Sequence, residues 1–376
     1  MKKLIVLSSI AFLFVIQTSF AQEPIRVGII QPLTGSIALD GQAAVNGAKL
    51  AVEQINAKGG VLGRKIELVV EDGMCKPNET RAAAEKLIAK DKVPVFIGAF
   101  CSTASLAAKP VAMKYGIPMV NAISTSPKLL EDPIKYYFRM PPGERALAKA
   151  SVKFFVDTNK VKTVCILAVN DDWGRNATKD FGDLFEESGV KILSKDLFSH
   201  GETDYLPFIT KVKGVNPDAM FIVAEAQDGA LLIKQMREQG LKKPTLATGA
   251  IVESHFIKLA GADSEGIYGG AEWAPGIQDP LNVAFVKDYM IRYPQLGTPG
   301  KYPAAGYDAV IIIADAVKRA GGTDSEKLTK AIEQTKMDTL HGTNFRFDER
   351  HRGIAYVVVT RIKDGKVQVI RHVPAD

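Results

Sequence analysis

Two hydroxyl-rich turns are the residues of this chain best suited to binding a small anion. Ser102 and Thr103 follow one apolar run and open a stretch with helical periodicity, while Ser124 and Thr125 follow the next apolar run at 117–120. Serine and threonine are common helix N-caps, so a purely structural role is one interpretation. The free amides of a helix N-terminus also attract anions, so two such turns together favour a carboxylate site.

Two further positions combine an unusual side chain with the end of an apolar run. Trp173 follows the run at 162–169, and Glu225 follows the run at 219–224. A large aromatic residue in a loop is suited to cover an apolar ligand, although Trp173 is equally suited to a hydrophobic core. Glu225 is either an acid that faces a ligand or an exposed acid in the first turn of a helix.

The motifs of common enzymes and metal sites are missing from the sequence. None of the five histidines forms a His-Glu-x-x-His pattern, and no cysteines have zinc-site spacing. We find no phosphate-binding glycine loop after a strand and no Gly-x-Ser-x-Gly elbow. The formal net charge of +6 comes without a basic block. We therefore expect no cofactor, no metal, no catalytic activity and no nucleic-acid partner.

The elements that must position these side chains alternate between strand and helix. Because ligands bind at the carboxyl ends of strands in open α/β sheets, the turns above are well placed. The order predicts an α/β fold with two doubly wound, Rossmann-like lobes joined by a three-strand hinge. Periodicity predicts helices at 41–57, 78–90, 102–115, 144–159, 173–188, 205–213, 227–239, 280–293, 304–320 and 325–334. It predicts strands at 25–31, 65–72, 93–98, 117–120, 136–140, 162–169, 191–198, 219–224, 245–248, 354–362 and 367–373.

The chain is expected to cross between the lobes three times. The run Pro141-Pro142-Gly143 predicts the first crossing, a short strand near 269–273 is expected at the return to the first lobe, and a third crossing is expected near Glu349. These crossings assign residues 22–142 and 273–348 to lobe 1, and residues 143–272 and 349–376 to lobe 2.

The N-terminus and the cysteines indicate export. Residues 1–21 combine a basic start, an apolar run too short to span a bilayer, and a small-x-small cleavage site before Gln22, which is typical of a signal peptide. An exported protein can form disulfides. Cys75 and Cys101 each follow an expected strand, whereas Cys165 lies inside an apolar run and is expected to be buried and unpaired.

Taken in order along the chain, several short motifs resemble the type I periplasmic solute-binding proteins of ABC transporters. The similarity is to the family that binds leucine, isoleucine and valine, with its relatives for amides, urea and aromatic acids, and it covers nearly the whole mature chain. The motifs lie at 28–35, 55–61, 71–77, 97–102, 116–118, 124–127 and 302–308.

The resemblance implies roles for individual residues. The disulfide of the first lobe falls on Cys75 and Cys101, and the serine that binds the ligand carboxylate falls on Ser102. The turn that also holds the carboxylate, through its backbone and a hydroxyl, falls on Ile123 and Thr125.

The part of the site that binds the ligand amine departs from the family pattern. The aromatic lid falls near Trp173, but a tyrosine of the first lobe falls on Asp40, and the acid that pairs with the ligand ammonium falls on Ala250. Either Glu225 or Glu253 supplies the acid instead, or the ligand has no α-amine.

The function that the resemblance implies is a periplasmic receptor of an ABC importer. It would bind a small, branched-chain-like amino acid in a cleft that closes by hinge bending, and it would dock as a monomer on the membrane permease. The alternatives are a receptor for an aromatic or other carboxylate or amide without an α-amine, and an extracellular sensory binding protein.

Overall fold

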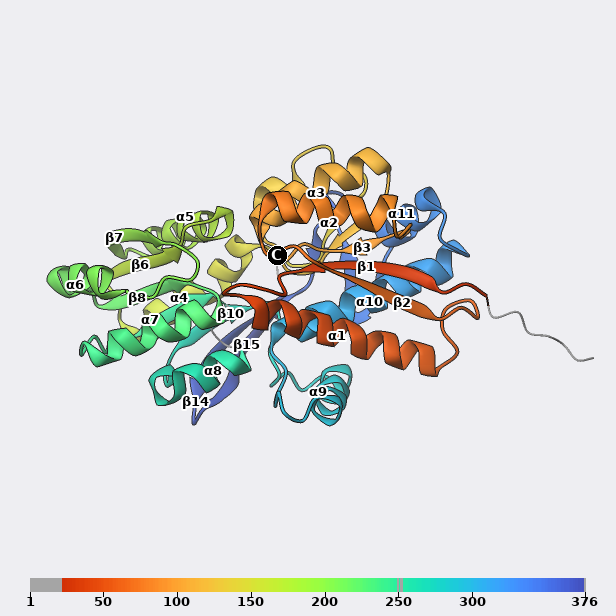
Figure 1. Cartoon of the computed structure of the whole chain (residues 1–376). Coiled ribbons are helices and arrows are strands. Elements are labelled where there is room, and N and C mark those ends of the chain that lie inside the picture. The colour runs from red at the N-terminus through yellow and green to blue at the C-terminus, as the bar shows by residue number, and fades with distance from the viewer. Residues whose placement is uncertain (1–21, 249, 251–252, 375–376) are drawn as a thin grey trace, which may run out of the picture.

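The structure, a computed structural model, describes residues 22–248, 250 and 253–374 (Figure 1). The expected signal peptide at 1–21 lies outside the described residues. The helices are α1 (Ala38–Ala57), α2 (Pro77–Ala89), α3 (Ser102–Tyr115), α4 (Glu144–Asn159), α5 (Asp172–Glu187), α6 (Leu206–Val215), α7 (Ala226–Glu238), α8 (Ser254–Ala260), α9 (Pro280–Arg292), α10 (Lys301–Ala320) and α11 (Ser325–Glu333). None of the helices in the described residues is long and apolar enough to cross a bilayer.

The first lobe is built on a five-stranded sheet in the order β2-β1-β3-β4-β5. All neighbouring strands in it are parallel. Helices α2 and α3 pack together on one face, and α1 packs with α10 on the other (Figure 1). The strands are β1 (Ile25–Gln31), β2 (Ile66–Asp72), β3 (Phe96–Ile97), β4 (Met119–Asn121) and β5 (Tyr137–Arg139).

The second lobe is built on a seven-stranded sheet in the order β15-β14-β10-β9-β8-β6-β7. Helices α4 and α5 contribute to the apolar cluster on one side, and α6, α7 and α8 contribute to the other. The strands are β6 (Thr163–Val169), β7 (Lys191–Phe198), β8 (Ala219–Val223), β9 (Thr245–Thr248), β10 (Tyr268–Ala271), β14 (Tyr356–Lys363) and β15 (Lys366–Pro374). The first sheet is fully parallel, and in the second β10, β9, β8, β6 and β7 are parallel while β14 and β15 are antiparallel. The two helix-covered sheets confirm the predicted α/β fold class.

Some elements differ from the sequence-based expectation. The strand expected at the return to the first lobe is β10, which pairs with β9 and β14 inside the seven-stranded sheet. A small sheet of β11 (Lys336–Thr339), β12 (Gly342–Phe347) and β13 (Gly353–Ile354) was not expected, nor was α8. The mixed exposure of β11 and β12 explains the miss, because these strands lack a continuous apolar run.

Glycines set the close contact between α1 and α10. A Cβ atom at Gly47 would lie 1.8 Å from the carbonyl oxygen of Pro303, and a Cβ at Gly306 would lie 2.0 Å from that of Ala44. Only glycine therefore allows the two helix backbones to approach this closely. The contact fixes the N-terminus of α10, which reaches the space between the lobes.

Candidate functional site

A small cavity lies where the two lobes meet. The space inside it is ≈ 20 Å³, about enough for one water molecule. Both lobes contribute to its wall, so the lobes are closed on each other around it. The lining residues are Phe100, Cys101, Ser102, Ile123, Ser124, Thr125, Glu144, Asp171, Trp173, Glu225, Lys301 and Tyr302.

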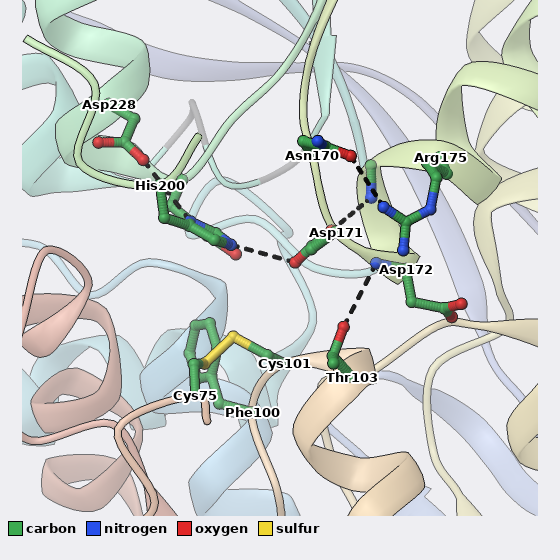
Figure 2. A network of polar contacts seen from close by, with 12 residues as sticks. Cys75, Phe100, Cys101, Thr103, Asn170, Asp171, Asp172, Arg175, His200 and Asp228 are labelled. Carbon is green, nitrogen blue, oxygen red and sulfur yellow. Dashed lines mark hydrogen bonds and ion pairs between the residues drawn. A yellow bond between two sulfur atoms is a disulfide. The ribbon is translucent and has the colours of Figure 1, made fainter. Parts of the chain in front are cut away.

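The N-terminus of α3 forms part of the cavity wall. Ser102 is the first residue of this helix and is 1% exposed. Its Oγ accepts a hydrogen bond from the backbone N–H of Ser126 at 3.2 Å, so its hydroxyl hydrogen remains able to donate. The first amides of a helix lack partners within the helix, and they can bind an anion here. The predicted disulfide is confirmed, because Cys101, directly before Ser102, is bonded to Cys75 (Figure 2).

The second hydroxyl turn has a largely structural role at Ser124. The Ser124 hydroxyl lies 2.8 Å from the carbonyl oxygens of both Ala99 and Phe100. The backbone N–H groups of Ile123 and Ser124 donate to the side-chain oxygen of Asn121 at 3.0 and 2.8 Å. These bonds hold the turn rigid, and Ile123 adds an apolar surface to the cavity.

Glu144 joins the two lobes at the cavity and was missed by sequence reasoning. Its Oε1 accepts hydrogen bonds from Thr125 Oγ1 at 2.9 Å and from Trp173 Nε1 at 2.7 Å. Its Oε2 is buried and has no hydrogen-bond partner among the described residues. Burial raises the pKa of the Glu144 carboxyl. The only sequence signal was its place directly after the predicted crossing at Pro142 and Gly143.

Glu225 is another acid in the cavity wall. This position agrees with its interpretation as an acid that faces a ligand and not with that as an exposed acid. It precedes α7 and is 4% exposed. The hydroxyl of Tyr302 donates to its Oε2 at 2.7 Å. Burial, reinforced by the charge of Asp40, raises the pKa of Glu225 to about 8.

Glu253 and Ala250 lie outside the lining. Glu253 accepts a hydrogen bond from the backbone N–H of Lys301 at 2.6 Å, at the N-terminus of α10. Ala250 is fully buried and packs in the apolar cluster of the five-stranded lobe. Of the two acids proposed to replace the one expected at Ala250, Glu225 is therefore the one that lines the cavity.

Two other charged groups in the wall already have partners of opposite charge. The ammonium of Lys301 lies 3.1 Å from the carboxylate of Glu272. Asp171 lies 3.1 Å from Nε2 of His200, whose other ring nitrogen is 3.7 Å from Asp228 (Figure 2). Burial alone lowers the pKa of His200, but the two aspartates outweigh it and raise the pKa to about 10. His200 is therefore cationic at neutral pH and balances the charge of Asp171.

Further polar contacts join the closed lobes around the cavity. Thr103, a predicted site residue, lies outside the lining and accepts a hydrogen bond from the backbone N–H of Asp172 at 3.3 Å (Figure 2). The carboxylate of Asp172 also pairs with Lys128 at 2.6 Å. His255 pairs with Asp40 at 2.6 Å. Thr103 thus acts between the lobes rather than at the cavity wall.

Two more lining residues, Lys301 and Asp171, were not among the site residues expected from the sequence. Lys301 carried no recognisable motif, although it directly precedes the matched motif that begins at Tyr302. Asp171 lies two residues before Trp173, but no sequence motif around it indicated that it pairs with His200. Within the described residues, no cluster of histidine, cysteine or acidic side chains could hold a metal ion.

The sequence of this chain is similar to that of a known protein family. The sequence pattern of the periplasmic binding proteins matches residues 24–366. A leucine-, isoleucine-, valine-, threonine- and alanine-binding protein of Pseudomonas aeruginosa is 27% identical over 332 residues, which cover 88% of each chain.

Solved structures show the same architecture. The branched-chain amino acid binding protein LivJ of Streptococcus pneumoniae, in complex with isoleucine, is similar with a TM-score of 0.84 and 26% identity, over 93% of this chain and 99% of that one. A solute-binding protein of R. palustris in complex with benzoate has a TM-score of 0.86 over 94% and 96% of the two chains. Its 20% identity indicates a shared fold alone.

Proposed function

Because the chain belongs to the periplasmic binding protein family, we propose that it captures a small, branched-chain-like amino acid between its lobes and delivers it to an ABC importer. The observation that carries the proposal is the cavity whose wall comes from both lobes. A ligand that contacts both walls stabilises closure, because its contacts with the two lobes exist together only in the closed form.

The lining chemistry suits a small amino acid. Ser102 and the amides of α3 can bind a carboxylate. Phe100, Ile123 and Trp173 supply apolar surface for an aliphatic side chain. A space of ≈ 20 Å³ is too small for an amino acid, so ligand entry requires the lobes to open.

The ligand contacts in this proposal are Ser102, Ile123, Trp173 and Glu225, with Ser124 and Thr125 shaping the turn. Lobe 1 comprises residues 22–142 and 273–348, and lobe 2 comprises 143–272 and 349–376, which is supported by the membership of the two large sheets. Residues 1–21 direct export to the periplasm and are cleaved before Gln22. The receptor works as a monomer with the permease as its partner.

A ligand panel tests the proposal. We expect leucine, isoleucine, valine or alanine to raise the melting temperature, since a ligand at about 100 times its Kd stabilises the folded state by about 2.7 kcal/mol. Thermal shift selects the ligand and titration calorimetry measures its Kd. Sugars serve as negative controls. If benzoates raise the melting temperature and no amino acid does, the proposal is wrong.

A further inference from the structure

We propose that a pocket beside the hinge binds a phosphate group and that the bound phosphate favours closure of the lobes. This hinge pocket has a volume of ≈ 490 Å³ and adjoins the interlobe cavity, with which it shares Thr125 and Glu144. Its lining comes from residues within 125–149, from Asp180 and from residues within 348–352. It is a second site, separate from the one in the proposed function.

Arg139 is the buried cation of the hinge pocket. It ends β5, lines the pocket and is 4% exposed. Its Nη1 donates to the backbone carbonyls of Thr125 at 2.9 Å and Ser126 at 3.1 Å, and its Nη2 donates to that of Pro142 at 3.1 Å. Its Nε is buried and has no hydrogen-bond partner among the described residues.

The charge of Arg139 has no full countercharge. It forms no ion pair among the described residues, and its three acceptors are neutral carbonyl groups. Burial lowers the pKa of Arg139 to about 10, so the side chain is cationic at neutral pH. A buried charge is costly unless an opposite charge balances it. An anion in the hinge pocket supplies that charge, and guanidinium groups are well suited to phosphate oxygens.

A second cation of the lining is also free of ion pairs. Lys149 lies on α4 and has no ion-pair partner within the part of the chain that the structure describes. Arg352 pairs with Asp348 at 2.9 Å. Arg145 and Arg350 pair with acids outside the lining. Lys149 and the buried arginine are therefore the two lining cations that an anion can pair with directly.

The acids of the lining favour an anion that carries a proton. Burial raises the pKa of the half-buried Asp180, and nearby cations that include Arg139 act against the rise. Glu144 accepts its hydrogen bonds at the interlobe cavity, and Glu349 is exposed. Part of phosphate keeps a proton at neutral pH, so it can accept hydrogen bonds from cations and donate one to Asp180. Sulfate has no such proton, and the pocket should therefore prefer phosphate.

A phosphate in the hinge pocket links the two lobes. Arg139 ends a strand of the five-stranded sheet, and Lys149 lies on a helix of the other lobe. An anion that contacts both stabilises the closed form, because both side chains line one pocket in that form. Arg139 also holds the backbone of Thr125, which lines the interlobe cavity, so the two sites are in direct contact.

Thermal shift and calorimetry with inorganic phosphate test the site. At neutral pH and equal ionic strength, phosphate should raise the melting temperature more than sulfate or chloride does. Glycerol phosphate, measured in parallel, shows whether a phosphate ester or free phosphate is the tighter ligand. Lys149→Gln should weaken phosphate binding by roughly fivefold to tenfold, because it removes a charge-assisted contact. Arg139→Gln should abolish binding, and Lys149→Gln decides the question if Arg139→Gln fails to fold.

Lys153→Gln is the matched control. Lys153 lies one turn further along α4, pairs with Asp157 and is outside the lining, so phosphate affinity should stay unchanged. Asp180→Asn should narrow the preference for phosphate over sulfate. If neither phosphate compound stabilises the protein more than chloride does, or if both lysine variants lose affinity equally, the site is refuted.

Small-angle scattering of the solute-free protein tests the link to closure. Phosphate at a concentration that saturates the wild type should reduce its radius of gyration, and the reduction should be smaller in Lys149→Gln. A wild-type radius that phosphate leaves unchanged refutes the inference. These measurements use no amino acid, so their failure leaves the proposed function standing, and a ligand panel in which no amino acid binds leaves the phosphate site standing.

Discussion

At the residue scale, similar hydroxyl groups have different tasks because they face different partners. Ser102 accepts one backbone hydrogen bond and keeps its own hydrogen to donate. Ser124 is held between two carbonyl oxygens. Thr103 contacts the opposite lobe, and Thr125 donates to Glu144. Only Ser102 combines a lining position, a donor without a fixed acceptor and a helix N-terminus, so it is the best candidate for binding a carboxylate.

Two serine variants separate binding from stability. Ser102→Ala should weaken every carboxylate ligand by roughly tenfold, because it removes one donor to the ligand, and it should also lower the free energy of unfolding by about 1 kcal/mol, because the buried N–H of Ser126 loses its acceptor. Ser124→Ala should mainly lower the free energy of unfolding, by about 1–3 kcal/mol, because the buried carbonyl oxygen of Phe100 loses its hydroxyl donor, whereas that of Ala99 keeps the hydroxyl of Ser105. Calorimetry and chemical denaturation measure the two effects. Carboxylate binding by Ser102→Ala that matches the wild type would contradict this assignment.

At the element scale, helix N-termini from both lobes converge on the cavity. Parallel strands in each sheet end at the same edge, so the helices that follow them begin there. Each of these helix starts, together with that of α10, brings at least one lining side chain. They include Ser102 at α3, Glu144 at α4, Trp173 at α5, Glu225 at α7 and Lys301 at α10.

The packing of α10 against α1 should determine both stability and binding. Gly306→Ala places a Cβ 2.0 Å from a backbone oxygen of α1, so it should lower the free energy of unfolding by about 1–3 kcal/mol. It should also weaken ligand binding, because α10 carries Lys301 and Tyr302 into the wall. Gly214→Ala is the control in α6. A Cβ there meets nothing within 4 Å, so the change should stabilise by about 0.5–1 kcal/mol. Equal effects of both changes in denaturant unfolding would contradict the packing argument.

At the scale of the whole molecule, closure of the lobes buries acids. Glu225 meets Tyr302 and Glu253 meets the start of α10, each across the boundary between the lobes. Burial raises the pKa of Glu225 to about 8, with Asp40 adding to the shift. Burial also raises the pKa of Glu253 to about 7, although His255 acts in the opposite direction. The closed form therefore binds protons that an open form, with these acids in water, releases.

The ligand-free protein should close more readily in acid. Because the pKa values of Glu225 and Glu253 are raised in the closed form, protonation of these acids favours closure most at a pH near or below their ordinary pKa of 4.5. This contribution to closure is lost as the pH rises through 7 and 8. Small-angle scattering should show a smaller radius of gyration at pH ~5 than at pH ~9. The double variant Glu225→Gln and Glu253→Gln should reduce the difference. A wild-type radius that is the same at both pH values would rule out this linkage.

The sequence by itself determined the fold class and the regular elements, because these depend on local periodicity. The helices at 102–115 and 144–159 and the strand at 191–198 have the predicted limits. The Cys75–Cys101 pairing followed from the family resemblance. By contrast, β3 is shorter than predicted, and the polar strands β11 and β12 were missed, since pairing with neighbours rather than an apolar pattern defines them.

The tertiary structure alone decided which side chains face each other across the cavity. Ser102 was predictable, because a hydroxyl at a helix start has a recognisable local chemistry. Glu144 was not, because its partners Thr125 and Trp173 are 19 and 29 residues away and one of them lies on the other lobe. The choice between Glu225 and Glu253 likewise depended on how the lobes close. Charge balance in a buried site depends on distances through space, and the order of residues along the chain does not contain those distances.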